Sequence, residues 1–405
     1  MAKLAEMLLR DPAGPLTSGA AFIINEPARE TSTLATSPSW TVDFRENCKV
    51  VVARGDPIDD FSRARDSALS EVQRALDLLS VQGRGDYSVV DVAREHLVWW
   101  VADGRTTIRI VSVITQPLEI PGVQVSGGTP VPRPPISWHP SYRFYRLSQY
   151  TTDLADAYRN LFLALESLLS DLAPMKVKPN GKSGEGEGEW FRRALTEAGQ
   201  LVDLGQFAPP GSSDPVDAVY VDLYERTRTA TFHAKQGRPT FLSHEPAQRA
   251  DLAAAVQRAM RLYLKLAEVR HHAYRSWSGF YSYGFMMSTG GIDDKVIVHV
   301  TDDEAPWSPD ETVPNPTGGA VVTLPAPLSS ELTGTFLKSF LAVGDVSSLE
   351  PVKTIRRIVT AVRDNGLIHA NMLEGPLTLD GIDVLQFHFG LRGENVGHPR
   401  SDYAT

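Results

Sequence analysis

The segment between Asp153 and Pro174 constrains the fold of this chain more than any other. Its apolar residues recur at the spacing of one face of an α-helix: Leu154, Tyr158, Leu161, Phe162, Leu165, Leu168 and Leu169. Asp153 is a residue type that caps helix N-termini, and the helix is expected to end before Pro174. Because an apolar face this broad has to be covered, the segment predicts a helix that packs against partner helices.

Three further helices are predicted, and we expect them to pack against this apolar face. One runs from Trp190 to Leu204, one begins at the cap-and-proline pair Asp214-Pro215, and one begins near Ser243 or Glu245. Each carries an apolar stripe of its own, and the polar, glycine-rich stretch 176–188 between the first two predicted helices is expected to be a loop. The four helices together predict a central antiparallel four-helix bundle.

The segment before the bundle mixes strand and helix patterns. Lys49 to Ala53 has the pattern of a strand, Ser62 to Ser80 that of an amphipathic helix, and Asp103-Gly104 that of a hairpin turn. The proline-rich stretch from Pro121 to Pro140 is expected to be a linker or a surface loop. These elements predict a small α+β unit.

The segment after the bundle has a similar mixture. Residues 295–300 and 320–324 are predicted strands, 351–363 is a predicted helix, and Asp380-Gly381 is a predicted hairpin turn. The whole sequence therefore predicts an α+β multidomain protein. Its expected parts are an N-terminal α+β domain over residues 1–145, a helical bundle over 146–275 and a C-terminal α+β domain over 276–405.

Charge and cysteine content narrow the functional classes. A formal net charge of -9 argues against broad, non-specific adhesion to nucleic acid, so any site for a polyanion has to be local. Cys48 is the only cysteine, which excludes an intrachain disulfide and a cysteine-cluster metal site. The first residues lack a signal-peptide pattern and no apolar run approaches the roughly 20 residues that span a bilayer, so we expect a cytoplasmic protein without a membrane segment.

An arginine and a histidine stand close together near the end of the third predicted helix, at Arg228 and His233. A guanidinium is planar and permanently charged, so it can hold two oxygens of one phosphate. An imidazole titrates near neutral pH and can take up or release a proton. These are the two tasks of metal-free RNA cleavage by attack of a ribose 2′-hydroxyl. On a regular helix the two residues would lie about 140° apart, so their convergence needs long side chains, a loosened last turn or a second subunit.

The order of these features resembles the HEPN superfamily, particularly its Apea-like branch. The shared features are an apolar helix with Ala164-Leu165-Glu166, a loose insert, a tryptophan-led helix, a proline-initiated helix with an arginine-to-histidine pair at its end, and a long closing helix. The resemblance covers residues 146–275 and implies an HEPN-like bundle that acts as a homodimeric, metal-independent RNA endonuclease. It also implies catalytic roles for Arg228, His233 and Thr229, no cofactor, and a place in a defence or toxin system.

The arginine-to-histidine spacing is not unique to this helix. Arg133 and His139, Arg238 and His244, Arg363 and His369, and Arg392 and His398 satisfy it too, and only their contexts argue against them. Arg226 satisfies the longer spacing to His233, and it can instead pair with Asp222 on the helix surface. Arg226, Lys235 and Arg238 are predicted to contact the RNA backbone.

A second interpretation makes the bundle a non-catalytic dimerisation or scaffold module whose flanking domains bind a partner protein or a regulatory ligand. The acidic net charge and the threonine at position 229, where the resemblance leads us to expect asparagine or aspartate, favour it. The ten histidines form no spacing motif for a metal, so no metal site is expected.

Overall fold

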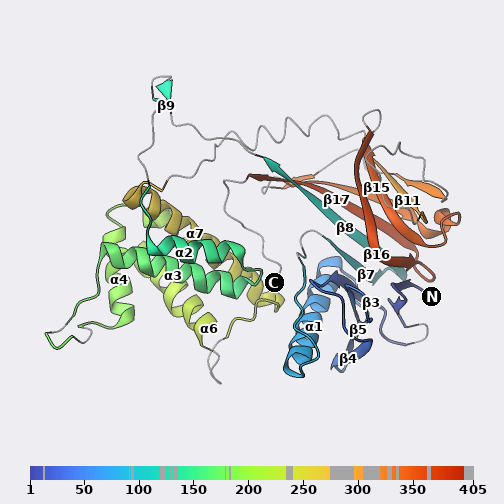
Figure 1. The fold of residues 1–405 in the computed structure, drawn as a ribbon, viewed down its shortest axis with the longest axis horizontal. Coiled ribbons are helices and arrows are strands. Elements are labelled where there is room, and N and C mark those ends of the chain that lie inside the picture. The colour runs from blue at the N-terminus through green and yellow to red at the C-terminus, as the bar shows by residue number, and fades with distance from the viewer. Residues whose placement is uncertain are drawn as a thin grey trace. The chain divides into compact units, whose positions relative to one another are not determined.

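A computed structural model of the chain describes residues 1–11, 14–90, 92, 95–118, 125–126, 129–130, 136–177, 179–181, 184–233, 240–273, 296–303, 320–325, 331–333, 337–362 and 366–395. These residues fall into two units, which are described separately below (Figure 1). The first unit comes from Met1–Glu119 and Gly279–Val396, and the second comes from Ile120–Ser278.

The first unit corrects the predicted fold class, because its N-terminal and C-terminal segments form common sheets. Strand β17 (Val384–Asn395) runs parallel to β8 (Arg105–Leu118) along its whole length. Strand β16 (Gly366–Thr378) pairs antiparallel with β1 (Lys3–Leu4). The expectation of separate N-terminal and C-terminal α+β units is therefore wrong. Pairing between strands so distant in sequence leaves no local pattern from which it can be predicted.

The larger sheet has nine strands within the described residues and is built from both segments. In spatial order they are β13 (Glu331–Thr333), β14 (Leu337–Asp345), β17, β8, β7 (Glu95–Ala102), β3 (Ser18–Ile23), β6 (Val50–Gly55), β5 (Trp40–Phe44) and β4 (Ser32–Ser37). Among these nine strands as described, only the β17–β8 pairing is parallel, and the other pairings are antiparallel.

The smaller sheet has six strands in the part of the chain that the structure describes. In spatial order they are β12 (Val321–Leu324), β11 (Val296–Thr301), β15 (Ile355–Val362), β16, β1 and β2 (Met7–Leu8). A separate two-stranded ribbon pairs β9 (Val125–Ser126) with β10 (Thr129–Pro130), and a short 3-10 turn, η3 (Val346–Leu349), follows β14.

The first unit is layered as sheet, sheet and helix. One apolar core contains residues of both sheets, among them Trp99 and Phe387 of the larger sheet and Ile358 and Leu377 of the smaller one. A second core lies between the larger sheet and α1 (Phe61–Val81), whose Ala68, Val72 and Leu76 are buried there among other residues. The amphipathic helix is thus used to cover the sheet face that the second sheet leaves open.

Several local predictions for this unit are confirmed. Helix α1 covers the predicted helix 62–80, and β6 covers most of the predicted strand 49–53. Asp103 and Gly104 form the two-residue turn between β7 and β8, with φ angles of 52° and 73°. Positive φ at both positions is what a tight hairpin turn of this type requires, and the Asp-Gly pair accepts it.

Two other local predictions are wrong. The predicted helix 351–363 contains strand β15, whose β-branched run Ile358-Val359-Thr360 is buried and suits a strand paired on both edges. The predicted hairpin at Asp380-Gly381 does not form, because β16 before it belongs to the smaller sheet and β17 after it to the larger one. In both cases the partner strands come from elsewhere in the chain.

Two histidines, His96 buried and His388 half-buried, lie in one row across the larger sheet. His96 of β7 and His388 of β17 are both in register with Val111 of β8. Burial, reinforced by the positive charge of Arg65, lowers the pKa of His96 to about 3. Burial and the positive charge of Arg109 lower the pKa of His388 to about 4. Both side chains are therefore neutral in the folded protein near neutral pH.

Unfolding of this unit is expected to become easier as the pH falls from 7 to 5. An unfolded histidine has a pKa near 6.5, so in this window the unfolded chain binds protons that the folded chain does not. The stabilisation that the two neutral histidines provide is complete above pH 6.5. It is lost as the pH falls toward their pKa values in the folded chain, about 4 for His388 and about 3 for His96. We expect a loss of roughly 2 kcal/mol for each histidine at pH 5, measured by urea titration. His388→Gln should flatten this dependence, and an unchanged slope in that variant contradicts the assignment.

The second unit is helical, but no antiparallel four-helix bundle is evident among its described residues. Its elements are α2 (Pro140–Tyr150), α3 (Leu154–Leu172), α4 (Glu187–Ala198), η1 (Leu204–Gln206), α5 (Pro215–Val219), the π-helix η2 (Tyr220–Arg228), α6 (Thr229–Phe232) and α7 (Pro246–His271). The predicted bundle is therefore corrected to this larger set of unequal helices.

Two local features of the backbone explain why the helices differ from the predicted bundle. Helix α2 stands where the linker was expected to end, because Pro140 begins a helix as its first residue with His139 as the cap. The predicted third helix is divided into α5, η2 and α6, since the backbone widens to π geometry between Tyr220 and Arg228. The helical spacing of apolar residues in the sequence indicates neither the additional helix α2 nor the division of the third predicted helix.

Helix α3 is the centre of this unit. Asp153 caps it through a hydrogen bond from the backbone N–H of Asp156, as its sequence predicts. Its Tyr158, Leu161 and Phe162 are fully buried in a core shared with α4, η2 and α7. Across the described residues of both units, every helix is too short or too polar to cross a membrane.

Candidate functional site

Arg228 is the last residue of the π-helix η2. A π-helix is rare, and where one occurs it is often at a functional site. The Arg228 side chain is 17% exposed, and its guanidinium carbon lies 4.9 Å from the ring centre of Tyr224, 5.4 Å from that of Phe232 and 5.7 Å from that of Phe162. Three rings at these distances form an aromatic enclosure that stabilises the cation.

Two carboxylates accompany the guanidinium. Nη2 of Arg228 donates a hydrogen bond of 2.9 Å to Oε2 of Glu187, at the start of α4, and the Tyr224 hydroxyl donates to the same oxygen at 3.3 Å. Burial raises the pKa of Glu166 on α3, against the opposing effect of the Arg228 charge. Nε of Arg228 is buried and has no hydrogen-bond partner in the described part of the chain. The Nε–H of the guanidinium is thus among the donors left for a further acceptor.

Thr229 directly follows Arg228 in the sequence, and His233 directly follows Phe232. The Thr229 hydroxyl donates to the backbone carbonyl of Tyr224 at 3.4 Å. His233 caps the C-terminal end of α6 with an extended backbone, and its carbonyl accepts a hydrogen bond of 3.4 Å from the Thr240 hydroxyl. Arg228 and His233 therefore flank α6, which has four residues, and no hydrogen bond, ion pair or ring contact joins the two side chains within the described chain.

The predicted RNA-contacting residues are placed as follows. Arg226 donates to the buried carboxylate of Asp222, which is the pairing that its spacing indicates as the alternative. Lys235 and Arg238 lie outside the described residues. The same Asp222 carboxylate receives two hydrogen bonds from Arg258 of α7, of 2.6 and 3.0 Å. Asp222 is therefore an anchor for η2 against α7.

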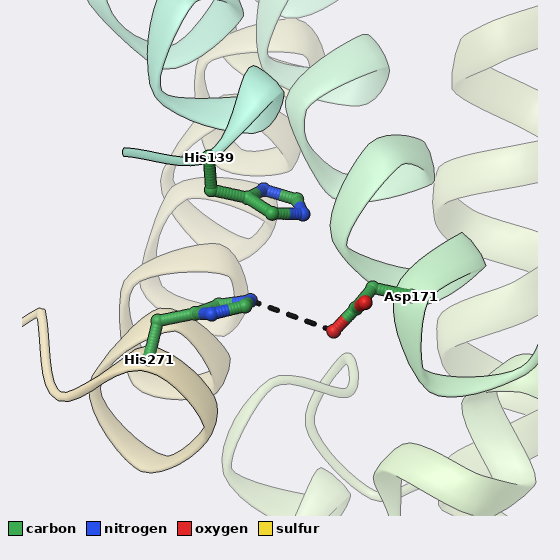
Figure 2. A group of neighbouring side chains, drawn as sticks. All are labelled: His139, Asp171 and His271. Atoms are coloured by element: carbon green, nitrogen blue, oxygen red, sulfur yellow. Dashed lines mark ion pairs between the residues drawn. The ribbon is translucent and has the colours of Figure 1, made fainter. Parts of the chain in front are cut away.

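A second cluster in this unit brings together His139, Asp171 and His271 (Figure 2). His139 is the cap of α2, Asp171 lies in the last turn of α3, and His271 is the last residue of α7. One ligand atom of each lies within 4.8 Å of the others. Both imidazole rings are turned toward Asp171, with their ring centres 4.5 Å apart and Nε2 of His271 at 3.7 Å from Oδ2 of Asp171.

Neighbouring groups hold this cluster in place. Nδ1 of His139 lies 2.8 Å from the hydroxyl of Ser141, which in turn lies 3.1 Å from the hydroxyl of Tyr263. Nε of Arg270 donates to Oδ2 of Asp171 at 3.1 Å. Burial lowers the pKa of His271, and the adjacent His139 lowers it further, whereas Asp171 raises it. The site thus favours the neutral form of the His271 imidazole.

Sequence reasoning missed this cluster. His271, with His272, has the position of a basic residue that complements the negative end of a helix, and His139 attracts notice only through its spacing to Arg133. The three residues come from three helices and have no diagnostic spacing. Only the packing of α2, α3 and α7 brings them together.

No protein-family model, no curated protein and no solved structure matches this chain.

Proposed function

We propose that the helical unit cleaves RNA without a metal ion, with Arg228 and His233 as its catalytic residues. The observation that carries the proposal is the guanidinium of Arg228, which lies at the end of a π-helix with its Nε buried and unpartnered. A cation held in place by three rings and one carboxylate is preorganised to receive a second acceptor, such as a phosphate oxygen. Because RNA is an intracellular substrate, the proposal places the protein in the cytoplasm.

The proposed reaction is a transesterification. The ribose 2′-oxygen forms a bond to the adjacent phosphorus while the bond from phosphorus to the 5′-oxygen breaks, which leaves a 2′,3′-cyclic phosphate and a 5′-hydroxyl. Arg228 stabilises the negative charge on the non-bridging oxygens. His233 accepts the 2′-hydroxyl proton, and water donates a proton to the leaving oxygen. Because Arg228 and His233 flank α6 without touching each other, the proposed cleft combines Arg228 of one chain with His233 of another.

Glu187 competes with the phosphate in this proposal. Its side chain is 58% exposed, so RNA can displace it from Arg228 without unpacking α4. We expect Glu187→Gln to bind RNA more tightly by up to about fivefold, which corresponds to about 1 kcal/mol for an exposed ion pair. Fluorescence anisotropy with a short labelled RNA measures the affinity. Glu197→Gln removes the same charge near the other end of α4 and should leave the affinity unchanged, so equal gains in both variants point to net charge alone.

The test of the proposal is incubation of the purified full chain with labelled RNA in the presence of EDTA. Cleavage that leaves cyclic phosphate ends, and that fails on the same sequence with a 2′-deoxy sugar at the scissile position, supports the mechanism. Cleavage that EDTA abolishes, or products that lack the cyclic phosphate, would contradict it.

A second candidate function is a non-catalytic dimerisation or scaffold module that binds a partner protein or a regulatory ligand. The ion pair to Glu187 and the ring contacts favour it, because they already give Arg228 a structural role. In that case the chain is a dimer in solution by mass measurement and leaves RNA intact under every condition tested. A regulated nuclease of a defence or toxin system would instead gain activity when its signal is supplied.

A further inference from the structure

The cluster of His139, Asp171 and His271 has the composition of a transition-metal site. Imidazole nitrogens suit Zn²⁺ and other late first-row ions, and a carboxylate oxygen completes sets of this kind, whereas Mg²⁺ and Ca²⁺ prefer oxygen ligands alone. We propose that these three side chains bind one divalent transition-metal ion, with Zn²⁺ as the representative, and that water fills the remaining coordination position. This site is independent of the proposed nuclease, which needs no metal.

The ligand atoms lie somewhat farther apart than such an ion requires. Zn²⁺ lies about 2.0–2.2 Å from nitrogen and oxygen ligands in a tetrahedron, which places the ligand atoms roughly 3.4 Å from one another. Nε2 of His271 and Oδ2 of Asp171 are 3.7 Å apart, and all three ligand atoms lie within 4.8 Å of one another. Small side-chain rotations close the remaining gap, because both rings are already turned toward the carboxylate (Figure 2).

The hydrogen bonding of the two histidines leaves one nitrogen of each for an ion. Nε2 of His271 is buried without a hydrogen-bond partner in the described chain, which is uncommon for a polar atom inside a protein. Nδ1 of His139 lies 2.8 Å from the Ser141 hydroxyl and accepts a hydrogen bond of 3.2 Å from the Ser141 backbone N–H, so Nε2 is the nitrogen of that ring left for the cluster. A metal ion at Nε2 moves the ring proton to Nδ1, which then donates to the buried Ser141 hydroxyl, as the second nitrogen of a metal-bound histidine typically does.

The surrounding charges also favour a cation. Asp171 and His271 lie in the last turns of α3 and α7, where the backbone carbonyls give a helix its negative end. Arg270 opposes this with a positive charge, but its hydrogen bond to Asp171 also fixes the orientation of the carboxylate. The ion would join α2, α3 and α7 at one place and so tie together three separate parts of the chain.

Isothermal titration of the full chain with Zn²⁺, after removal of metals by chelation, tests the site. The expected stoichiometry is one ion per chain, accompanied by a rise in the melting temperature. His139→Gln, Asp171→Asn and His271→Gln should each weaken binding by at least about tenfold, because even the loss of a supporting hydrogen bond costs a metal site about 10- to 100-fold. Ser141→Ala should fall within that range. His272→Asn is the matched control: it removes the neighbouring imidazole and suits the left-handed backbone there, with φ of 54°.

The outcomes separate clearly. Stoichiometric zinc binding supports the site if all three ligand variants weaken it and His272→Asn leaves it unchanged. X-ray absorption spectra should then show two imidazoles around the bound zinc. No binding by the wild type, binding that all the ligand variants keep, or binding that depends on only one of the three side chains overturns it. Asp171→Asn should still cleave RNA in EDTA if the proposed nuclease is correct, so the two proposals fail separately.

Discussion

Arg228→Lys is expected to cleave RNA at least about 100-fold more slowly than the wild type. Lysine keeps the positive charge and the attraction to the surrounding rings, but it lacks the planar fork that holds two phosphate oxygens. Loss of one donor to the developing charge of a transition state costs about 10²–10³-fold in rate. The rate is measured with saturating RNA in EDTA, so that a change in RNA affinity does not enter. A lysine variant with the wild-type rate would leave Arg228 with the structural role that its ring contacts already give it.

Mixing two inactive variants tests whether the cleft is shared between chains. His233→Asn should also lose activity, since general acid–base catalysis contributes about 10²–10⁴-fold. If Arg228 of one chain acts with His233 of the other, a mixed dimer of Arg228→Lys and His233→Asn chains keeps one intact cleft. Activity then returns on mixing. If both residues have to come from one chain, the mixture stays inactive.

The sequence predicts best the elements whose signals are local. Asp153 and the apolar stripe after it give α3, and Asp103-Gly104 gives the β7–β8 turn, because each depends on residues within a few positions. The parallel pairing of β17 with β8 depends instead on two strands from opposite parts of the chain. No local spacing carries that information, so the two flanking segments looked like two units.

The candidate sites were likewise predictable only where their residues are close together in the sequence. Arg228 and His233 are close in sequence and could be singled out together, but their side-chain partners could not: Glu187 and Phe162 come from α4 and α3. The π-helix that ends at Arg228 is also hidden, since it changes the turn without changing the residues. His139 stood in a proline-rich stretch that looked like a linker, and its role as the cap of α2 appears only in the fold.

Asp222→Ala is expected to destabilise the helical unit by about 3–5 kcal/mol, the usual cost of removing one partner of a buried ion pair. The Asp222 side chain is 3% exposed and accepts hydrogen bonds from Arg226 and Arg258. Arg258, whose side chain is 19% exposed, would keep its charge without this carboxylate. Urea titration measures the change in unfolding free energy. Hydrogen exchange of residues 219–228 should rise with it, because Asp222 joins η2 to α7.

The expected loss of stability comes from the charge that Arg258 keeps without this partner, and not from the loss of the ion pair itself. A double substitution distinguishes these two causes. Replacing both partners of a buried pair by apolar residues of similar volume is often neutral or stabilising. Asp222→Leu combined with Arg258→Met should therefore recover most of the stability that Asp222→Ala loses. Glu225→Gln, an exposed change on the same π-helix, should have little effect. If the double variant is as unstable as Asp222→Ala, the ion pair itself holds η2 in its π geometry, and RNA cleavage should fall in parallel because Arg228 ends that helix.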